Sequence, residues 1–510
     1  MAAAFRLAPL ALAAMLLSNE CRADWKVTPL FDLRETYTDN VSQQRDEIAR
    51  NQFITEAAPG LSVTAKTPRL ELSANARWRL FSFSDKGNDP NLHDSERNYQ
   101  ASGRAMLVDQ FMYVDASASS TRQSVSAFGQ LSDSPYSNTN RTDVSTWRIS
   151  PYLQHRFGSF ASGELRYGRD SVSAAVGGYG SSVASNTSAN LSSGTAFVDL
   201  GWYLSYNRQQ LKEEVTGDST SQNSVVGLRY RVASHLALTT SAGYDDYSYA
   251  ALSERTAGPS WTLGFIWTPS TRSKLEASFG HRYFGKTGSL DGTHRSRNIV
   301  WNLNYSDQVT TTRSQFLLPA SIDTAAMLDR MFSASFPDPV QRQQAVQAYI
   351  AATGLPPSLA NSINYLSNRY VRAKQLRGAA ILRGARSSLS FSVFKDRREA
   401  LSLQQSDSTL LGSQLATLND NVNQRGANID AEYRLSPISS LSASAYLVRA
   451  QSLETGITNN SRTWRLAASR RFGKHTTGNI EARHSRGNFG FAENSVYHEN
   501  AIAATLSVLY

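Results

Sequence analysis

The sequence lacks a long apolar segment outside its first residues. Beyond the N-terminus no run of about 20 apolar residues occurs, which is the length that a transmembrane helix needs. We therefore do not expect a helical membrane protein. A membrane-spanning β-barrel remains possible, because each of its strands is apolar on only one face.

Cysteine is almost absent, and Cys21 is the only one in the 510 residues. It lies in a predicted signal peptide, residues 1–23, in which Arg6 supplies the positive charge. Residues 7–17 supply an apolar core that is too short to span a bilayer.

The predicted cleavage site follows Ala23 and leaves a mature chain of residues 24–510. That chain would contain no thiol, no disulfide and no cysteine metal ligand. The alternative is a lipoprotein site at Cys21, which Asn19 and Glu20 disfavour because small residues are required at those places.

Charge is also sparse, since charged residues make up 18% of the chain, and lysine is rarer still. Only 9 of the 52 basic residues are lysine, and the formal net charge is +10. A basic excess can indicate nucleic-acid binding, but these arginines are scattered through an exported chain, so we expect no nucleic-acid partner. Two interpretations remain: arginine–carboxylate pairs inside a barrel, or a basic lumen that attracts an anionic solute.

What the mature sequence does have is alternation of apolar and polar residues in segments of strand length. Strand side chains point alternately to opposite faces, so one face is apolar and the other polar. The clearest apolar sets are Leu70, Leu72, Ala74, Ala76 and Trp78; Trp261, Leu263, Phe265 and Trp267; Ile299, Trp301, Leu303 and Tyr305; and Leu441, Ala443, Ala445 and Leu447.

The connections between these segments are alternately short and long. Short turns are predicted at 64–69, 108–110, 157–159, 233–235, 269–272, 436–440 and 473–476. Long polar loops are predicted at 38–51, 84–97, 123–144, 208–222, 246–258 and 397–423. This pattern is typical of outer-membrane barrels, which have short periplasmic turns and longer external loops.

The predicted fold is an all-β membrane protein: a closed antiparallel barrel of about 22 strands, within a range of about 18 to 24. We count about 14 strands through Tyr305 and about 7 from Tyr370 onward, and an even total requires one more. The segment Val309–Phe316 is the candidate for it.

Residues 321–366 break the strand pattern and are predicted to form a short helical insertion. Ala325, Leu328 and Phe332 recur at helical spacing, and Pro339 follows a candidate N-cap at Asp338. Strand parity places this insertion at the external end. It would cap the barrel, constrict it, bind a partner, or be an ordered loop without a specific role.

The last segment ends in an aromatic residue, as outer-membrane barrels do when they present a signal to the barrel assembly machinery. Leu506, Val508 and the terminal Tyr510 share one face of the predicted final strand. The usual terminal residue is Phe, so Tyr510 is a small departure.

No enzyme motif was found. The chain has no HExxH helix and no Gly-x-Ser-x-Gly motif, so we predict no catalytic residues, no metal site and no cofactor. The Gly217–Ser219 segment matches the start of an esterase motif only by chance, since it lies in a polar loop. A barrel hydrolase using an outward histidine such as His281, His484 or His498 is the alternative.

The polar face is where function is expected. The candidate lumen-facing residues are Arg77, Arg79, Arg229, Arg231, Arg282, Arg465, Glu71, Glu276, Asp430, Glu432, Glu481 and Tyr446. Acids and bases on neighbouring strands would neutralise each other, and unpaired arginines would form a basic track. Inward tyrosines could stack on sugar rings.

Several segments resemble one family, the PEP-CTERM system-associated outer-membrane barrels. They are YTDNV at 37–41, APGLSV at 58–63, SGTAF at 193–197, GYDDY at 243–247, WTPSTRSKLEASFGHRYFG at 267–285 and FPDPVQRQQAVQAYIAATGLP at 336–356. The resemblance runs along nearly the whole mature chain. It implies a place in the cell outer membrane beside exopolysaccharide and exosortase functions, and it supplies no catalytic residues.

We therefore expect a porin-like outer-membrane barrel that passes or exports an exopolysaccharide or a related anionic polymer. The alternative is a structural barrel that anchors surface polymer or sorted surface proteins without transport. The expected partners are outer-membrane lipid, the barrel assembly machinery, and exopolysaccharide or its export proteins.

Overall fold

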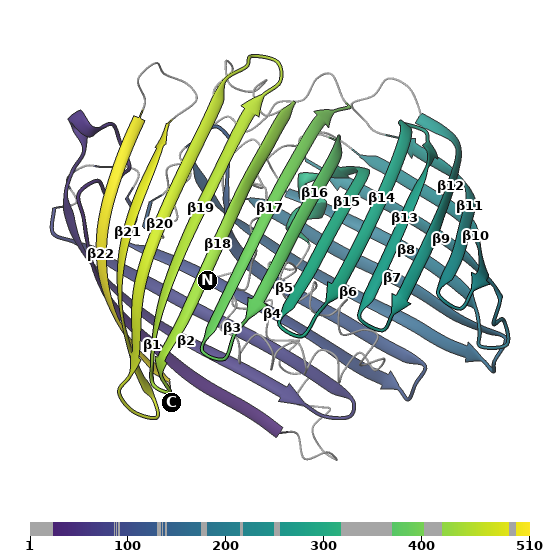
Figure 1. Cartoon of the computed structure of the whole chain (residues 1–510), viewed down its shortest axis with the longest axis horizontal. Coiled ribbons are helices and arrows are strands. Elements are labelled where there is room, and N and C mark those ends of the chain that lie inside the picture. Colours follow the sequence, from purple (N-terminus) through teal and green to yellow (C-terminus); the bar gives the residue numbers. More distant parts are fainter. Residues whose placement is uncertain are drawn as a thin grey trace.

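The structure is a computed structural model that describes residues 24–85, 87, 89, 92–129, 134, 136–137, 140–174, 181–214, 218–248, 256–317, 370–401, 421–488 and 496–509. A single sheet of 22 antiparallel strands forms a closed barrel (Figure 1). Each strand pairs with its neighbours in sequence, and β22 pairs with β1, which leaves no free sheet edge. Closure lets neighbouring strands pair all the way around the ring, as a membrane wall requires.

The bounds of the elements are as follows. The strands are β1 (Asp24–Thr38), β2 (Gln52–Lys66), β3 (Leu70–Phe83), β4 (Ser95–Val108), β5 (Met112–Ser124), β6 (Arg141–Phe157), β7 (Ala161–Ala174), β8 (Ser181–Ser193), β9 (Leu200–Glu213), β10 (Ser219–Ala233), β11 (Leu236–Ser248), β12 (Thr256–Ser270), β13 (Ser273–Arg282), β14 (Gly285–Arg295), β15 (Ile299–Thr311), β16 (Tyr370–Arg383), β17 (Ser387–Ala400), β18 (Val422–Ser436), β19 (Ser439–Ser452), β20 (Thr458–Arg471), β21 (Thr476–Asn488) and β22 (Val496–Leu509). Two short helices are described, η2 (Asp46–Ile48) and α2 (Thr312–Phe316).

The two ends of the barrel differ as the sequence predicts. Odd-numbered strands run from a short-turn end, with connections such as 234–235 and 271–272, to a long-loop end, with connections such as 39–51 and 125–140. One connection at the long-loop end, 283–284, is itself a tight turn. By the general pattern the long-loop end is external and the short-turn end is periplasmic.

The predicted total of 22 strands is confirmed, but the predicted strand Val309–Phe316 is wrong. Strand β15 extends to Thr311, and residues 312–316 form α2. Fifteen strands therefore precede residue 312, one more than the sequence pattern indicates, and the additional strand lies earlier in the chain. The β13–β14 hairpin is easy to overlook, because two aromatic residues, Tyr283 and Phe284, occupy its turn. Gly285, with φ +106°, supplies the backbone conformation that the turn needs.

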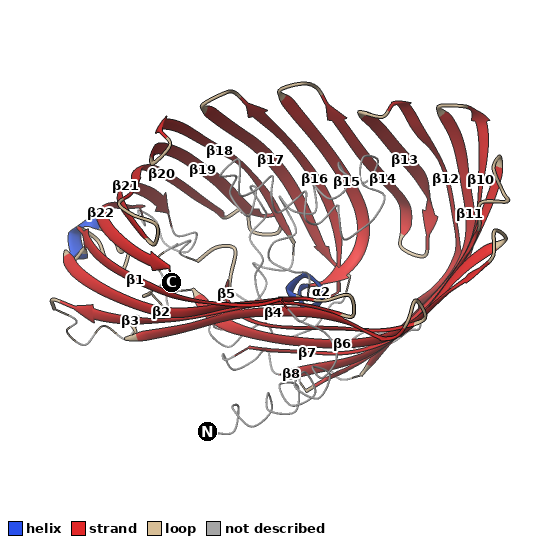
Figure 2. Cartoon of the chain, turned by 90° about the horizontal axis from the view of Figure 1, so that it is seen from below, coloured by secondary structure: helices blue, strands red, loops and turns tan. Residues whose placement is uncertain are grey.

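Contacts between segments that are not neighbours identify the inner face. Arg313 of α2 donates to Ser182 of β8, and Asn459 of β20 donates to the backbone carbonyls of Ala127 and Gly129 after β5. Such contacts are possible only across the lumen, and the strand registers carry the assignment around the ring. Figure 2 shows α2 inside the ring of strands.

The outer face carries the apolar side chains. On β12, Trp261 and Leu263 are each 45% exposed and Trp267 is 47% exposed, while Thr262 between them faces inward and contacts Ser241. Outward aromatic residues lie toward both ends of the wall, for example Trp78, Trp147 and Tyr244 toward the loops and Phe157, Tyr230 and Phe472 toward the turns. An apolar band between aromatic girdles is the surface that a lipid bilayer covers.

Three predicted features lie outside the described residues. These are the signal peptide 1–23, the helical insertion 321–366 and the terminal Tyr510. Among the residues that the structure does describe, no helix is both long enough and apolar enough to cross a membrane.

Candidate functional site: the inner wall and its mouth

The strand registers place all twelve candidate lumen residues on the inward face. Each candidate lies an even number of residues from another residue of its strand that faces the lumen. Because side chains alternate between the two faces of a strand, the candidate faces the lumen as well. The registers that show this are those of β3 with β2 and β4, β10 with β9 and β11, β13 with β12, and β18 to β21 with one another.

Two of the predicted arginines belong to a cluster of ion pairs on β1 to β4. Arg77 contacts Asp32 at 3.2 Å, and Arg79 contacts Glu56 at 3.4 Å and Glu96 at 3.3 Å. Next to this cluster, Arg34 of β1 pairs with the predicted Glu481 of β21 at 3.3 Å. These contacts favour the first interpretation of the arginines, because their charge is largely neutralised within the wall.

A second ion pair is more enclosed. Arg282 donates two hydrogen bonds to Asp245, at 2.9 Å and 2.8 Å, and a third to Tyr247 at 3.1 Å. Asp245 is fully buried and also accepts a bond from Asn223 at 2.5 Å. These charge-assisted hydrogen bonds to one buried carboxylate hold the three strands β10, β11 and β13 in register.

Arg229 and Arg231 differ from the other candidate arginines. Both are exposed on the inward face of β10 near the short-turn end, and neither side chain forms an ion pair or hydrogen bond with the residues that the structure describes. They are the cations available to a solute that enters from the expected periplasmic side.

The inner wall between β5 and β11 contains a hollow of about 560 Å³. Its inward lining is rich in amides and hydroxyls: Ser150, Asn186, Ser188, Asn207, Gln209, Ser221 and Asn223, with Asp115, Arg148, Arg166 and Tyr247. Gln209 donates to Asn186 at 2.8 Å, and Ser205 donates to Asn190 at 2.8 Å nearby. Arg166 lies over the ring of Tyr152 at 3.8 Å.

A loop at the external end folds inward and forms a strap along the lumen. We use the name strap for the described part of residues 125–140. Phe128 is fully buried against Val422 and Ala450 of β18 and β19. Asn459 of β20 donates to the backbone carbonyls of Ala127 at 3.0 Å and Gly129 at 2.9 Å. The strap therefore ties β5 and β6 to strands far around the ring and narrows the mouth.

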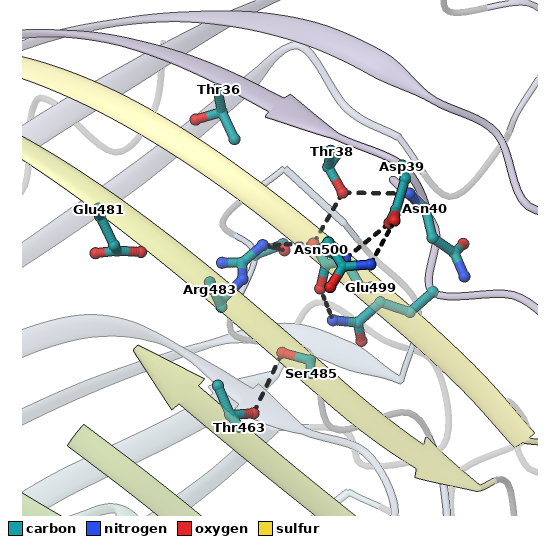
Figure 3. Close-up of polar contacts among 12 residues, drawn as sticks. Thr36, Thr38, Asp39, Asn40, Thr463, Glu481, Arg483, Ser485, Glu499 and Asn500 are labelled. Atoms are coloured by element: carbon teal, nitrogen blue, oxygen red, sulfur yellow. Dashed lines mark hydrogen bonds and ion pairs between the residues drawn. The ribbon is translucent and has the colours of Figure 1, made fainter. Parts of the chain in front are cut away.

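The strap passes close to a buried acid at the seam where the barrel closes. Figure 3 shows the contacts of this acid, Glu499. Glu499 of β22 is fully buried and accepts bonds from Thr38 at 3.1 Å, Gln43 at 2.6 Å and Arg483 at 2.5 Å. Arg483 also donates to Ser134 of the strap at 3.4 Å. The first strand, the last two strands and two loops thus meet at one charge.

Tyr136 of the strap packs edge-on against Phe81 and Phe83 of β3. Burial raises the pKa of its phenol, and the Glu499 carboxylate acts in the same direction. The side chain therefore stays neutral and serves as part of the packing between strap and wall.

A second bridge spans the mouth. Arg313 of α2 pairs with the fully buried Asp170 of β7, and Phe316 packs against Val125, Val144 and Val172. The strap and α2 meet in this apolar cluster, so the two inward segments support each other.

Sequence reasoning missed the buried acids Asp170, Asp245 and Glu499. Strand parity alone would have put them on the inward face, since Glu499 is three residues before the outward Ile502 and Asp245 follows the outward Tyr244. Parity could not show that they are fully buried, because that depends on the loops that cover them. The described residues contain no cluster of three or more His, Cys, Asp or Glu side chains suited to a metal ion.

Comparison with protein-family models and with curated proteins finds no match. Solved structures do match. The FrpB iron transporter from Neisseria meningitidis (F3-3 variant) has a TM-score of 0.50 at 10% identity, covering 98% of this chain and 83% of that one. The siderophore receptor PirA from Pseudomonas aeruginosa has a TM-score of 0.44 at 12% identity, covering 94% and 80%. A loop-deleted OmpT, an outer membrane protein of Vibrio cholerae, has a TM-score of 0.33 at 8% identity, covering 95% and 99%.

At these identities the likeness concerns the fold. The chain has the fold of an outer-membrane β-barrel, like that of the FrpB iron transporter. The closed barrel with its apolar outer face confirms the predicted location in the cell outer membrane.

Proposed function

We propose that the barrel is a passage for an exopolysaccharide or a related anionic polymer across the outer membrane. The observation that carries this proposal is the amide- and hydroxyl-lined hollow between β5 and β11. Sugar hydroxyls both donate and accept hydrogen bonds, and Asn, Gln and Ser side chains offer both functions in return.

Charge supports the same class of solute. Arg229 and Arg231 lie unpaired among the described residues at the short-turn end, where a polymer leaving the periplasm would enter. Unpaired cations in a narrow polar channel raise the local concentration of an anion. The resemblance of the sequence to barrels found beside exopolysaccharide genes agrees with this and stays a prediction.

The decisive experiment is polymer localisation in a strain that lacks the protein. Accumulation in the periplasm, reversed by the wild-type chain, is expected for a passage. Complementation with Asn186→Ala and Gln209→Ala should restore export poorly, because the two residues face each other across β8 and β9 on the inner wall.

The matched control changes the adjacent outward pair, Ser185→Ala and Gln210→Ala, which face each other across the same two strands. This control should restore export fully. Normal secretion with altered attachment of the polymer in the deletion strain would instead support the anchoring function.

The bridged mouth is the observation that favours an anchoring barrel without transport. Conductance in planar bilayers separates the two functions. Asn459→Ala removes both hydrogen bonds to the strap and should increase conductance, whereas Asn460→Ala, on the outward face of the same strand, should not. A barrel that stays silent in both variants would count against passage.

A further inference from the structure

The outer wall carries a row of cations that the lumen does not explain. Six outward-facing basic residues lie on six neighbouring strands near the long-loop end, and we call them the basic belt: Lys374, Lys395, Arg425, Arg449, Arg462 and Arg486. The neighbours of each belt residue in its strand face the lumen, so the belt side chain itself faces the lipid. For example, Arg425 lies between the inward residues Gln424 and Gly426.

The strand registers place these cations beside one another. Lys395 is directly opposite Arg425, and Arg425 is directly opposite Arg449. On the next strands Arg462 is directly opposite Arg486. Like charges directly opposite in antiparallel strands destabilise the pair, so this arrangement calls for a bound anion.

The strand registers place a carboxylate opposite only one of the six: Lys374 is opposite Asp307, whose carboxylate is bound by Arg372. None of the six side chains forms an ion pair or hydrogen bond with a described residue, and the Nε of Arg449 is buried without a partner. Other cations of the same strands do have one: Arg398 pairs with Asp396 at 3.1 Å on the inner face, and Arg397 pairs with Glu399 at 2.6 Å. The belt is therefore a separate set.

Its height on the wall identifies the surroundings. On the short-turn side of the belt, the outward residues of the same strands are apolar and exposed, including Leu376, Phe391, Ile429, Trp464 and Ile480. The belt thus lies at the external edge of the apolar band, which is the level of lipid headgroups in the outer leaflet.

We propose that the basic belt binds the phosphate groups of a phosphorylated lipid in the outer leaflet. Arginine binds phosphate through paired N–H donors, and several cations in a row can hold a headgroup that carries more than one phosphate. A lipid is the occupant because the belt faces the bilayer and continues directly from its apolar band. This site does not depend on what the lumen carries.

The test uses the mature barrel in zwitterionic detergent and native mass spectrometry. The probe is lipid A with two phosphates, and the comparison probe is the same lipid after dephosphorylation. The wild-type barrel should bind the phosphorylated form more tightly. The triple variant Lys395→Gln, Arg425→Gln, Arg449→Gln should bind it at least roughly tenfold more weakly, since three charge-assisted contacts are lost.

The matched control has the same change of charge elsewhere: Arg229→Gln, Arg231→Gln and Arg470→Gln, of which the first two face the lumen and the third lies at the short-turn end. It should bind lipid A like the wild type. Equal binding by the belt variant and the wild type would overturn the proposal. Displacement of the lipid by millimolar inorganic phosphate alone would assign the belt to free anions instead.

The wild-type comparison protects the test against a variant that does not fold. If the wild-type barrel binds phosphorylated and dephosphorylated lipid A equally, the belt does not recognise phosphate, and the proposal fails without any mutant. A folded variant with Arg425→Lys and Arg449→Lys should retain binding, because point charges still attract phosphate.

Discussion

Thr262 and Leu263 are adjacent in the chain and lie on opposite faces of β12. Thr262 bonds to Ser241 at 2.6 Å on the inner face, and Leu263 lies in the outer apolar band at the middle of the strand. Leu263→Arg should lower the free energy of unfolding by roughly 2–4 kcal/mol, because the charge would enter hydrocarbon. Thr262→Arg should cost clearly less, since lumen water can solvate it. Unfolding both variants in bilayers tests this; a larger cost at Thr262 would contradict the observed faces.

The buried carboxylate at the closing seam should matter more than an exposed one. Glu499→Ala leaves its three buried donors, Thr38, Gln43 and Arg483, without their anion, at a cost of about 3–5 kcal/mol. Glu276→Ala is the control, because its contact with Lys274 is nearly half exposed and should contribute at most about 1 kcal/mol. Urea unfolding of the two variants measures both values, and similar costs would mean that Glu499 does not hold the seam.

At the scale of single elements, the last strand has two tasks. β22 pairs with β21 and with β1, so its insertion closes the ring. Its outward residues Leu506 and Val508 lie in phase with the predicted assembly signal, whose terminal Tyr510 is outside the described residues.

Removing Tyr510, or changing it to Asp, should block assembly and leave an unfolded, protease-sensitive chain. The physical reason is that the assembly machinery would recognise an aromatic side chain on the final strand. Tyr510→Phe is the control and should assemble normally. Wild-type amounts of heat-modifiable barrel from the Asp variant would show that the signal lies elsewhere.

At the scale of the whole molecule, the mature chain should begin at Asp24, the first residue of β1. A chain cleaved there contains no cysteine, so thiol reagents and reducing agents should leave the folded barrel unchanged. Intact-mass spectrometry of the purified protein checks the N-terminus. A lipid-modified Cys21 would instead support the lipoprotein alternative.

The sequence by itself determined which way each strand faces and that the strand number is even. Both follow from local rules, the period of two along a strand and the need to close an antiparallel ring. The inward placement of Arg77, Arg282 and Glu481 was therefore readable from their own strands. The strand boundary at Val309–Phe316 was not, because the segment lacks a clear turn and α2 is held by contacts with β7 and β8.

Only the tertiary structure decided which charges find partners. Arg313 pairs with Asp170 of β7, a strand on the other side of the lumen. Asn459 holds the strap through the carbonyl of Ala127, which lies 332 residues earlier in the chain. These contacts depend on how loops fold into the lumen, and no periodicity encodes that. The row of outward cations is a mixed case: parity gives their face, but only the strand registers bring Lys395, Arg425 and Arg449 side by side.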